Sequence, residues 1–105
     1  MTRFTLYVPA SLNDGHTVPN RWTVDFEHRL AVEFGGFTRI DAIGGWKSPA
    51  EEVIREPMRL YVVDISDSAA EFAAMRMRQF AELVKHDLEQ ECVYLTRDTI
   101  DVHMI

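Results

Sequence analysis

The chain has 105 residues, of which 47% are hydrophobic and 27% charged, and this is the composition of one ordinary globular domain spanning residues 1–105. The formal net charge of −6, without any run of basic residues, argues against sequence-independent binding to nucleic acid or to an anionic membrane. The single cysteine excludes an intramolecular disulfide and a thiolate-based metal site within one chain.

The first predicted element is a strand over residues 2–8. Every second side chain is apolar, which is the period of a half-buried strand: Phe4, Leu6 and Val8. Residues 9–20 concentrate Pro, Asn, Asp and Gly and predict a loop. Thr17 is expected to cap the helix that follows this loop.

The first predicted helix covers residues 19–34 and is ended by Gly35 and Gly36. Apolar side chains recur at every fourth position and form one stripe: Trp22, Phe26, Leu30 and Phe34. Residues 36–43 then predict a second strand, and Gly44-Gly45 a turn or bulge. Trp46 follows, and its surroundings favour a lid over the end of the core, with an exposed anchor for a partner as the alternative.

A third strand is predicted over residues 60–65, because β-branched and aromatic residues dominate there. Pro57 is expected to separate it from a short preceding arm that folds back on Trp46. The second helix is predicted from Ser68, with Glu71 completing a capping box, to about Glu89. Its apolar stripe is Ala69, Ala73, Met77, Phe80, Val84 and Leu88.

Residues 92–105 predict two short strands separated by Arg97-Asp98. The resulting order predicts a ferredoxin-like βαββαβ two-layer α+β sandwich with an extra short C-terminal strand. Both helices are expected to cover one face of the sheet. Large aromatic side chains are expected to fill the core: Trp22, Phe26, Phe34, Phe72 and Phe80. The side chains expected from the sheet are Phe4, Leu6, Val8, Ile40 and Leu60.

Residues 35–65 read GGFTRIDAIGGWKSPAEEVIREPMRLYVVDI. They resemble a family of small uncharacterised bacterial proteins that share Gly-aromatic/aliphatic-Thr, Asp-Ala, Gly-x-Trp and then Arg-Glu ahead of an apolar strand. The segment is also similar to small proteins carried by bacteriophages. The resemblance implies the fold and brings with it no activity and no catalytic residue.

The open face of the predicted sheet is the main candidate site. Strand alternation is expected to place there two charged residues and three tyrosines: Tyr7, Arg39, Asp41, Tyr61 and Tyr94. Such a face suits the interface of a symmetric dimer, and a small anionic or aromatic ligand is the less favoured alternative.

No metal or cofactor site is expected. The four histidines have no helical i, i+4 spacing, and no glycine pattern forms a phosphate loop: His16, His28, His86 and His103. Residues 13–16, Asn-Asp-Gly-His, either form an active-site loop or are simply residue types that favour a turn, and the second interpretation is preferred. Cys92 is expected to be a buried, inert thiol.

These observations favour a non-catalytic binding or interaction module that forms a homodimer through the open sheet face, with a small molecule or another protein as further partner. The alternative is a small dimeric α+β barrel-type enzyme acting on an anionic or aromatic molecule. It would use His16 or His28 as base and Arg39 or a tyrosine to hold an anion. No apolar run is long enough to span a bilayer or to form a signal peptide, so a cytoplasmic location is expected.

Overall fold

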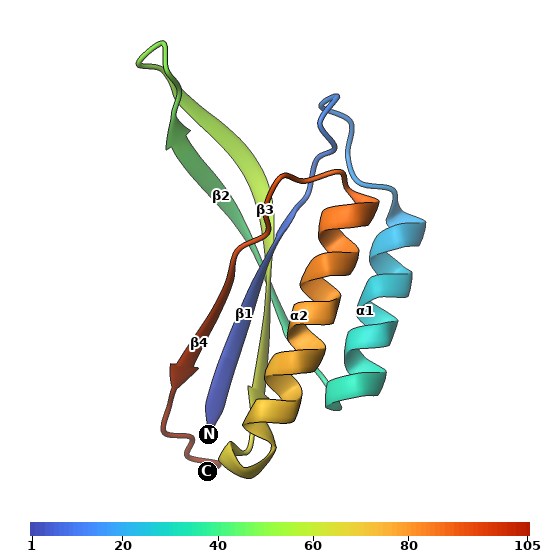
Figure 1. Cartoon of the computed structure of the whole chain (residues 1–105), viewed down its shortest axis with the longest axis vertical. Helices are drawn as coiled ribbons and strands as arrows, with labels where there is room; N and C mark the ends of the chain where they lie inside the picture. The colour runs from blue at the N-terminus through green and yellow to red at the C-terminus, as the bar shows by residue number, and fades with distance from the viewer.

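Four strands and two helices form two layers in the computed structural model of residues 1–105. The strands make one antiparallel sheet in the order β2-β3-β1-β4, and both helices lie side by side on one face of it (Figure 1). A short 3-10 helix, η1 (Asp67–Ala69), precedes the second helix. The main elements are β1 (Thr2–Pro9), α1 (Asn20–Phe34), β2 (Thr38–Lys47), β3 (Val53–Ile65), α2 (Ala70–Asp87) and β4 (Leu95–Thr99). This is the predicted ferredoxin-like α+β sandwich.

The chain crosses the sheet twice, once with each helix. α1 connects β1 to β2 across β3, and α2 connects β3 to β4 across β1. The predicted alternation of β1 is confirmed, because Phe4, Leu6 and Val8 are all buried beneath the helices. Residues 100–105 form no strand, so the extra C-terminal strand is absent and β4 runs through Arg97 and Asp98 without interruption.

Aromatic side chains fill the layer between helices and sheet. The ring of Phe26 on α1 stacks on Trp22, with centroids 4.8 Å apart, and meets Tyr61 of β3 and Phe80 of α2 at 5.2 and 5.9 Å. Burying rings of this size is a main source of stability for a domain of this length. Phe72, also expected in this core, lies on the outer surface of α2 and is 65% exposed.

Both predicted helix caps are wrong. Thr17 forms a bridge with Ser11 inside the loop, and Pro19 takes the N-cap position of α1 without a side-chain hydrogen bond. Ser68 lies within η1 and Ala69 is the N-cap of α2, so α2 begins one residue later than the capping box implies. The C-terminal signal of α1 is confirmed, since Gly35 adopts a left-handed φ of 82° and its N–H donates to the carbonyl of Ala31.

The phase of β3 differs from the prediction. Leu6 pairs with Tyr61 across the β1–β3 ladder, so Tyr61 points to the helix-covered face with Leu6. Leu60 and its partner Ile40 consequently lie on the opposite, open face, although both were expected in the core. In an antiparallel sheet a shift of one residue exchanges the two faces completely.

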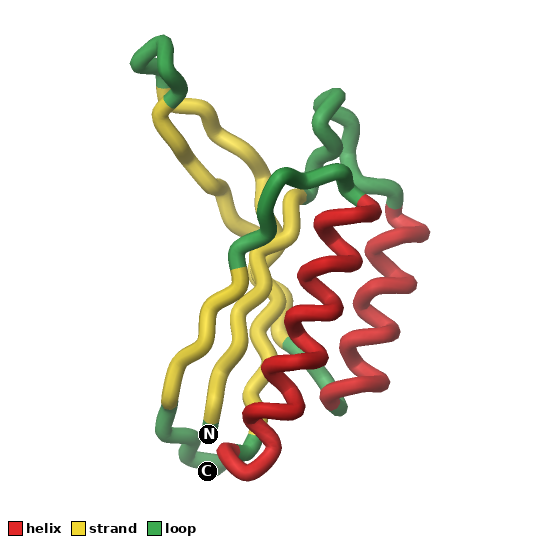
Figure 2. The backbone as a smooth tube through the Cα atoms, viewed as in Figure 1, coloured by secondary structure: helices red, strands yellow, loops and turns green.

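The β2–β3 hairpin extends well beyond the two-layer body. β1 ends at Pro9 opposite Met58, whereas β2 and β3 remain paired as far as Lys47 and Val53. We call this extension, residues 43–57, the arm; it leans away from the helix layer (Figures 1 and 2). Gly44 and Gly45, predicted as a turn or bulge, are regularly paired strand residues within the arm, and the chain reverses between Ser48 and Glu52.

Pro57 does not interrupt β3 because of the direction in which its backbone points. Its carbonyl accepts a hydrogen bond from the N–H of Ala10. In an antiparallel strand the N and O atoms of one residue point to the same side, so the missing N–H of Pro57 faces the edge where β1 ends. No bond to β2 is lost.

The two ends of the chain lie close together at the end of the body opposite the arm (Figure 1). The N–H of Ile100 donates to the carbonyl of Met1 at 3.0 Å. Neither helix is long and apolar enough to cross a membrane.

Candidate functional site

The five residues predicted to share the open face lie on both faces of the sheet. Tyr7 and Tyr94 are on the open face, where their rings lie 5.0 Å apart. Tyr61 and Arg39 are register partners on the helix-covered face, and Asp41 follows Arg39 two residues along β2 on the same side. The sequence therefore predicted a single site where the structure has two separate groups.

The open face carries a continuous apolar surface along the centre of the sheet. Ladder pairing places apolar side chains from the neighbouring strands β2 and β3 there, and the pair of Tyr7 and Tyr94 borders them. Ile40 is 47% exposed and Tyr94 is 65% exposed. An ion pair of Arg3 with Asp64, at 2.8 Å, lies at the end of this surface that is remote from the arm. We call this surface the open-face patch: Tyr7, Ile40, Met58, Leu60, Val62 and Tyr94.

On the other face, the carboxylate of Glu27 in α1 joins the helix to the sheet. Its Oε2 atom accepts hydrogen bonds from the hydroxyl of Tyr61 at 2.8 Å and from Nη1 of Arg39 at 2.9 Å. Arg39 also contacts Asp41 through Nε at 3.1 Å. Burial raises the pKa of Tyr61, and the neighbouring Glu27 carboxylate raises it further. The phenol therefore remains protonated at neutral pH and acts as a hydrogen-bond donor.

A second tie between α1 and the sheet lies beside the first. Arg59 of β3 donates from Nη1 to Oγ1 of the buried Thr23 at 2.6 Å. Together with the Glu27 network it fixes the position of α1 over β3. These polar side chains are already engaged with one another, which favours a structural role for this group.

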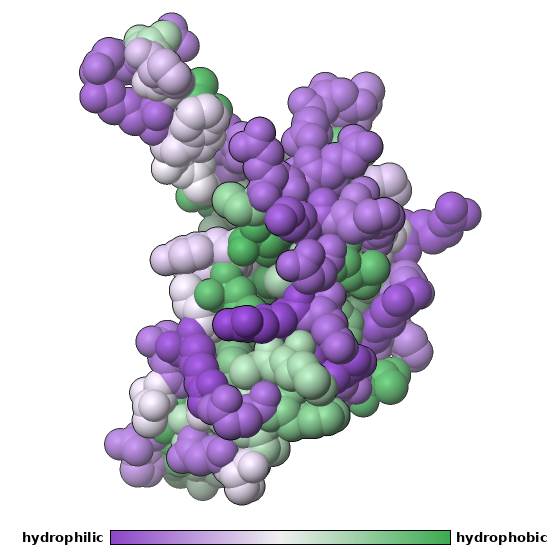
Figure 3. All heavy atoms as spheres, viewed as in Figure 1, coloured by the Kyte–Doolittle hydropathy of each residue, from purple (hydrophilic) through white to green (hydrophobic).

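Trp46 is an exposed side chain on the arm and does not cover the core. It pairs with Ile54 on the open face of the hairpin and is 51% exposed, so the predicted lid is wrong. Ile43 and Val53 are also exposed, on the other face of the arm. The arm stands clear of the body on the molecular surface (Figure 3).

A polar cleft of about 350 Å³ separates the arm from the loop between β1 and α1. Its lining comes from the loop, from the arm and from the segment after α2: Pro9, Ser11, Leu12, Asn13, Gly15, Ile54, Arg55, Glu56, Pro57 and Gln90. The amides are held in place, because Asn13 donates to the carbonyl of Glu89 at 2.8 Å and accepts from Gln90 at 3.2 Å. We call this the arm–loop cleft.

Unused backbone groups also face this cleft. Arg55 lies two residues before Pro57, so its N–H and C=O point to the same edge, beyond the end of β1. The side chains of Arg55 and Glu56 form no ion pair. The sequence contained a signal for this cleft, since Asn13 belongs to the Asn-Asp-Gly-His loop and Arg55-Glu56 to the segment that carries the family resemblance.

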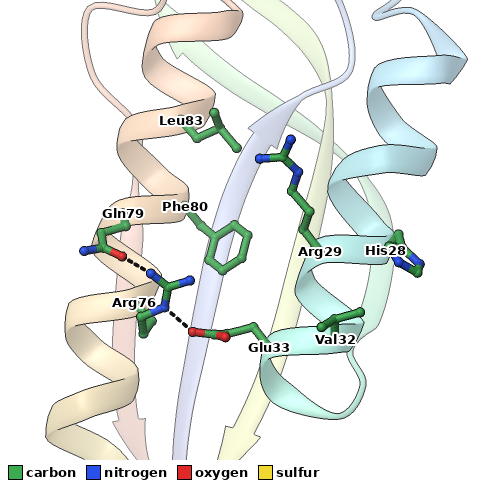
Figure 4. Close-up of a pocket in the computed structure, with 8 residues that line it drawn as sticks. All are labelled: His28, Arg29, Val32, Glu33, Arg76, Gln79, Phe80 and Leu83. Atoms are coloured by element: carbon green, nitrogen blue, oxygen red, sulfur yellow. Dashed lines mark hydrogen bonds and ion pairs between the residues drawn. The ribbon is translucent and has the colours of Figure 1, made fainter.

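The groove between the outer surfaces of α1 and α2 is a second hollow, of about 460 Å³ (Figure 4). Phe80 and Leu83 contribute its apolar part. Both of its arginines already have partners on the helices: Arg29 contacts Asp25 at 3.0 Å, and Arg76 contacts Glu33 and Gln79. An anion entering this groove would have to displace a carboxylate.

The remaining candidates do not converge. His16 contacts only Asp14 within its own loop, and His86 contacts the adjacent Asp87. No group of three or more His, Cys, Asp or Glu side chains has an arrangement that could hold a metal ion. Cys92 is exposed and precedes β4, which corrects the prediction of a buried thiol that begins a strand.

No known family model and no curated protein matches this sequence. Among solved structures, the chain is similar to a phage SAM lyase in complex with S-methyl-5′-thioadenosine, with a TM-score of 0.70 and 13% sequence identity. The match covers 92% of this chain and 79% of that chain. At this identity the likeness establishes the fold and nothing further.

Proposed function

We propose that this chain is a small binding module that forms a homodimer, and that the open-face patch is the surface between the two copies. The observation that carries this proposal is the apolar character of a sheet face that no helix covers. A face turned to water in an antiparallel sheet normally alternates to polar residues, whereas Ile40, Leu60 and Val62 lie here beside two tyrosines. A second copy presents the same surface and covers it symmetrically.

Sedimentation velocity of the Leu60→Glu variant tests this proposal. Leu60 lies at the centre of the patch, so a carboxylate there meets its own symmetry equivalent and is desolvated in the dimer. The variant is expected to sediment as a monomer with an unchanged circular dichroism spectrum. Val24→Glu is the control, since Val24 is 58% exposed on α1, away from the patch. A wild-type chain that is monomeric at high concentration would refute the proposal.

A second candidate function is the binding of a sulfur-substituted adenine nucleoside in the arm–loop cleft, with cleavage of SAM as the associated reaction. The likeness to a phage SAM lyase bound to S-methyl-5′-thioadenosine over 92% of this chain favours this candidate. The cleft has suitable chemistry for such a molecule. The free N–H and C=O of Arg55 suit the donor and acceptor edge of a purine.

The two charged side chains of the cleft fit the rest of such a ligand. The guanidinium of Arg55 can pair with a carboxylate, and the carboxylate of Glu56 with an ammonium or sulfonium cation. SAM carries all of these groups. Neither histidine considered as a base lines the cleft, so His16 and His28 have no part in this candidate.

Thermal unfolding with added SAM or S-methyl-5′-thioadenosine tests the second candidate. A ligand at about one hundred times its dissociation constant stabilises the folded chain by about 2.7 kcal/mol, which is easily detected. Chromatography of SAM incubated with the chain shows whether S-methyl-5′-thioadenosine is released. Arg55→Gln and Glu56→Gln are expected to reduce both signals, and Arg78→Gln on the exposed surface of α2 is the control. If neither compound raises the thermal unfolding midpoint, the second candidate is refuted and the non-catalytic binding module is the proposal that remains.

A further inference from the structure

We infer that the arm binds an extended peptide segment of another protein, which lies in the arm–loop cleft and pairs with the free edge of β3 as an added strand. This inference rests on the proposal that the chain is a binding module, and it names the partner and the surface that recognises it. It does not depend on the homodimer. The peptide uses the same backbone groups of Arg55 as the nucleoside of the second candidate, so the two ligands compete for the cleft.

Backbone groups of β3 are left without partners where the arm begins. β1 ends at Pro9, and the N–H of Ala10 donates to the carbonyl of Pro57. Arg55 and Val53 lie two and four residues before Pro57, so the N–H and C=O groups of both point to the same edge. The residues between them bond to β2 on the other side. Four backbone groups are therefore free at the spacing of a β-ladder, and we call them the arm edge.

The arm lacks the third strand that supports the rest of the hairpin. In the body β3 lies between β2 and β1, whereas residues 53–56 pair with β2 alone (Figure 1). A two-stranded hairpin is marginally stable in water, and a third strand is a usual means of stabilising it. A peptide that continues the line of β1 supplies this strand. It gains backbone hydrogen bonds and orders the arm at the same time.

A second wall favours the arm edge over the outer edges of β2 and β4. The loop between β1 and α1 faces it across the arm–loop cleft and contributes Ser11, Asn13 and Gly15 to the lining. The hydrogen bonds of Asn13 with Glu89 and Gln90 hold this wall in place. When a strand is added to a sheet, main-chain pairing provides affinity and the surroundings of alternate side chains provide specificity. The cleft offers both.

The side chains beside the arm edge define the peptide. Arg55 lies an even number of residues from Tyr61 along β3 and points to the helix-covered side, while Ile54 and Glu56 point to the open side. Neither charged side chain has an ion-pair partner. An acidic residue opposite Arg55, an apolar one opposite Ile54 and a basic one opposite Glu56 complement this edge. Because β1 runs antiparallel to β3, a peptide that continues β1 reads Lys-Glu-Val from its N-terminus.

The first test removes one backbone donor of the arm edge. Pro57 shows that proline is accommodated where the N–H points to this edge, so Arg55→Pro leaves the pairing with β2 intact. Arg55→Gln is the matched control, because it loses the charge and keeps the N–H. Fluorescence anisotropy measures the binding of a labelled, capped peptide with Lys-Glu-Val at its centre. Arg55→Pro is expected to raise the dissociation constant by about tenfold or more relative to Arg55→Gln.

The second test changes the peptide and leaves the chain as it is. In the inferred register the N–H of the peptide glutamate faces β3, and the N–H of the valine faces the loop. Methylation of the glutamate nitrogen is expected to abolish binding, and methylation of the valine nitrogen to raise the dissociation constant by less than about threefold. Hydrogen exchange at the amides of Val53 and Arg55 is expected to slow by about tenfold or more when the unmodified peptide is bound.

Two results would overturn the inference: no binding of the unmodified peptide to the wild-type chain, or equal effects of the two methylated peptides. The methylated peptides also decide the question if Arg55→Pro alters the circular dichroism spectrum. Leu60→Glu, which tests the homodimer, leaves the arm edge unchanged and is expected to bind the peptide as the wild type does. A monomeric wild type that binds the peptide would therefore refute the dimer alone, and a dimer that does not bind it would refute this inference alone.

Discussion

Tyr61 combines an aromatic contact with a polar one. Its ring lies in the core against Phe26 and Phe37, while its hydroxyl reaches the partly exposed carboxylate of Glu27. The hydrophobic part of the side chain therefore packs helix on sheet, and the polar end sets the position of α1 along β3. A glutamate at this position would bury a charge in the core, so Tyr61→Glu is expected to unfold the chain.

Tyr61→Phe isolates the hydroxyl. The variant keeps the ring and removes the bond to Glu27, and we expect it to lower the free energy of unfolding by about 1–2 kcal/mol, the usual contribution of a hydrogen bond to a charged group that is partly hydrated. Chemical denaturation measures the change. Tyr7→Phe is the matched control, since no side-chain hydrogen bond of Tyr7 exists. Equal midpoints for the two variants would mean that the bond adds nothing to stability.

The predicted elements succeeded where the apolar pattern had one interpretation. β1 alternates strictly, and its buried face was predicted correctly. The apolar stripe of α2 recurs at helical spacing, and its buried face was predicted correctly except at Ala69 and Phe72, which are exposed. β3 contains the unbroken run Leu60-Tyr61-Val62-Val63, which fits a strand in either phase. The wrong phase moved Tyr61 to the open face and Leu60 to the core, and the candidate site changed with it.

The turn signals within the β2–β3 hairpin failed for a different reason. Gly44-Gly45 and Pro57 indicate a break when each is considered alone. In the structure the two segments are partners in one hairpin, and Pro57 faces an edge that carries no strand there. The strands continue through these residues because β1 ends at Pro9 and leaves an open edge beside Pro57. Gly44, Gly45 and Pro57 do not by themselves indicate where β1 ends.

Phe80→Ala and Phe72→Ala compare two aromatic side chains of the same helix. Phe80 is 7% exposed and contacts Phe26 and Phe34, so its loss is expected to cost about 3–5 kcal/mol. Phe72 is exposed, and its truncation is expected to change stability by less than about 0.5 kcal/mol. Denaturation midpoints of the two variants measure these changes in stability. A larger loss at Phe72 would place α2 the other way round on the sheet.

At the scale of the molecule, carboxylates tie distant elements together. The hydrogen bond from Arg3 holds the pKa of Asp64 in β3 below its ordinary value, and the bond from the Trp22 indole does the same for Asp87 at the end of α2. Because the pKa is lowered in the folded state, both groups stabilise the fold at neutral pH. This contribution is lost as the pH falls through the folded-state pKa, below 3.8.

Acid unfolding tests whether these carboxylates stabilise the folded chain at neutral pH. The free energy of unfolding is expected to decline steeply below the ordinary carboxyl pKa, and Asp87→Asn is expected to make that decline shallower while lowering stability at neutral pH. Glu91→Gln, in the exposed segment after α2, serves as the control. An unchanged pH dependence in Asp87→Asn would show that its bond to Trp22 does not form in solution.

The whole fold was more predictable than the whole site. The order of elements and the length of the chain leave few arrangements, and the ferredoxin-like sandwich is the natural one. The arm–loop cleft depends on where one strand stops beside another, and on a loop, an arm and Gln90 that are remote in sequence. Of these residues, the sequence indicates only Asn13, through its loop, and Arg55-Glu56, through the segment that carries the family resemblance.

The position of β1 has a consequence for the order in which the protein is made. β1 is synthesised before both of the strands with which it pairs, β3 and β4, and Thr2 pairs with both Ile65 and Thr99. During synthesis this apolar strand therefore has no partner until β3 and β4 have been translated. Strand pairings so distant in sequence slow folding and leave intermediates that are prone to aggregate. The yield of folded protein should accordingly depend on chaperones that shield β1 until β3 and β4 have been synthesised.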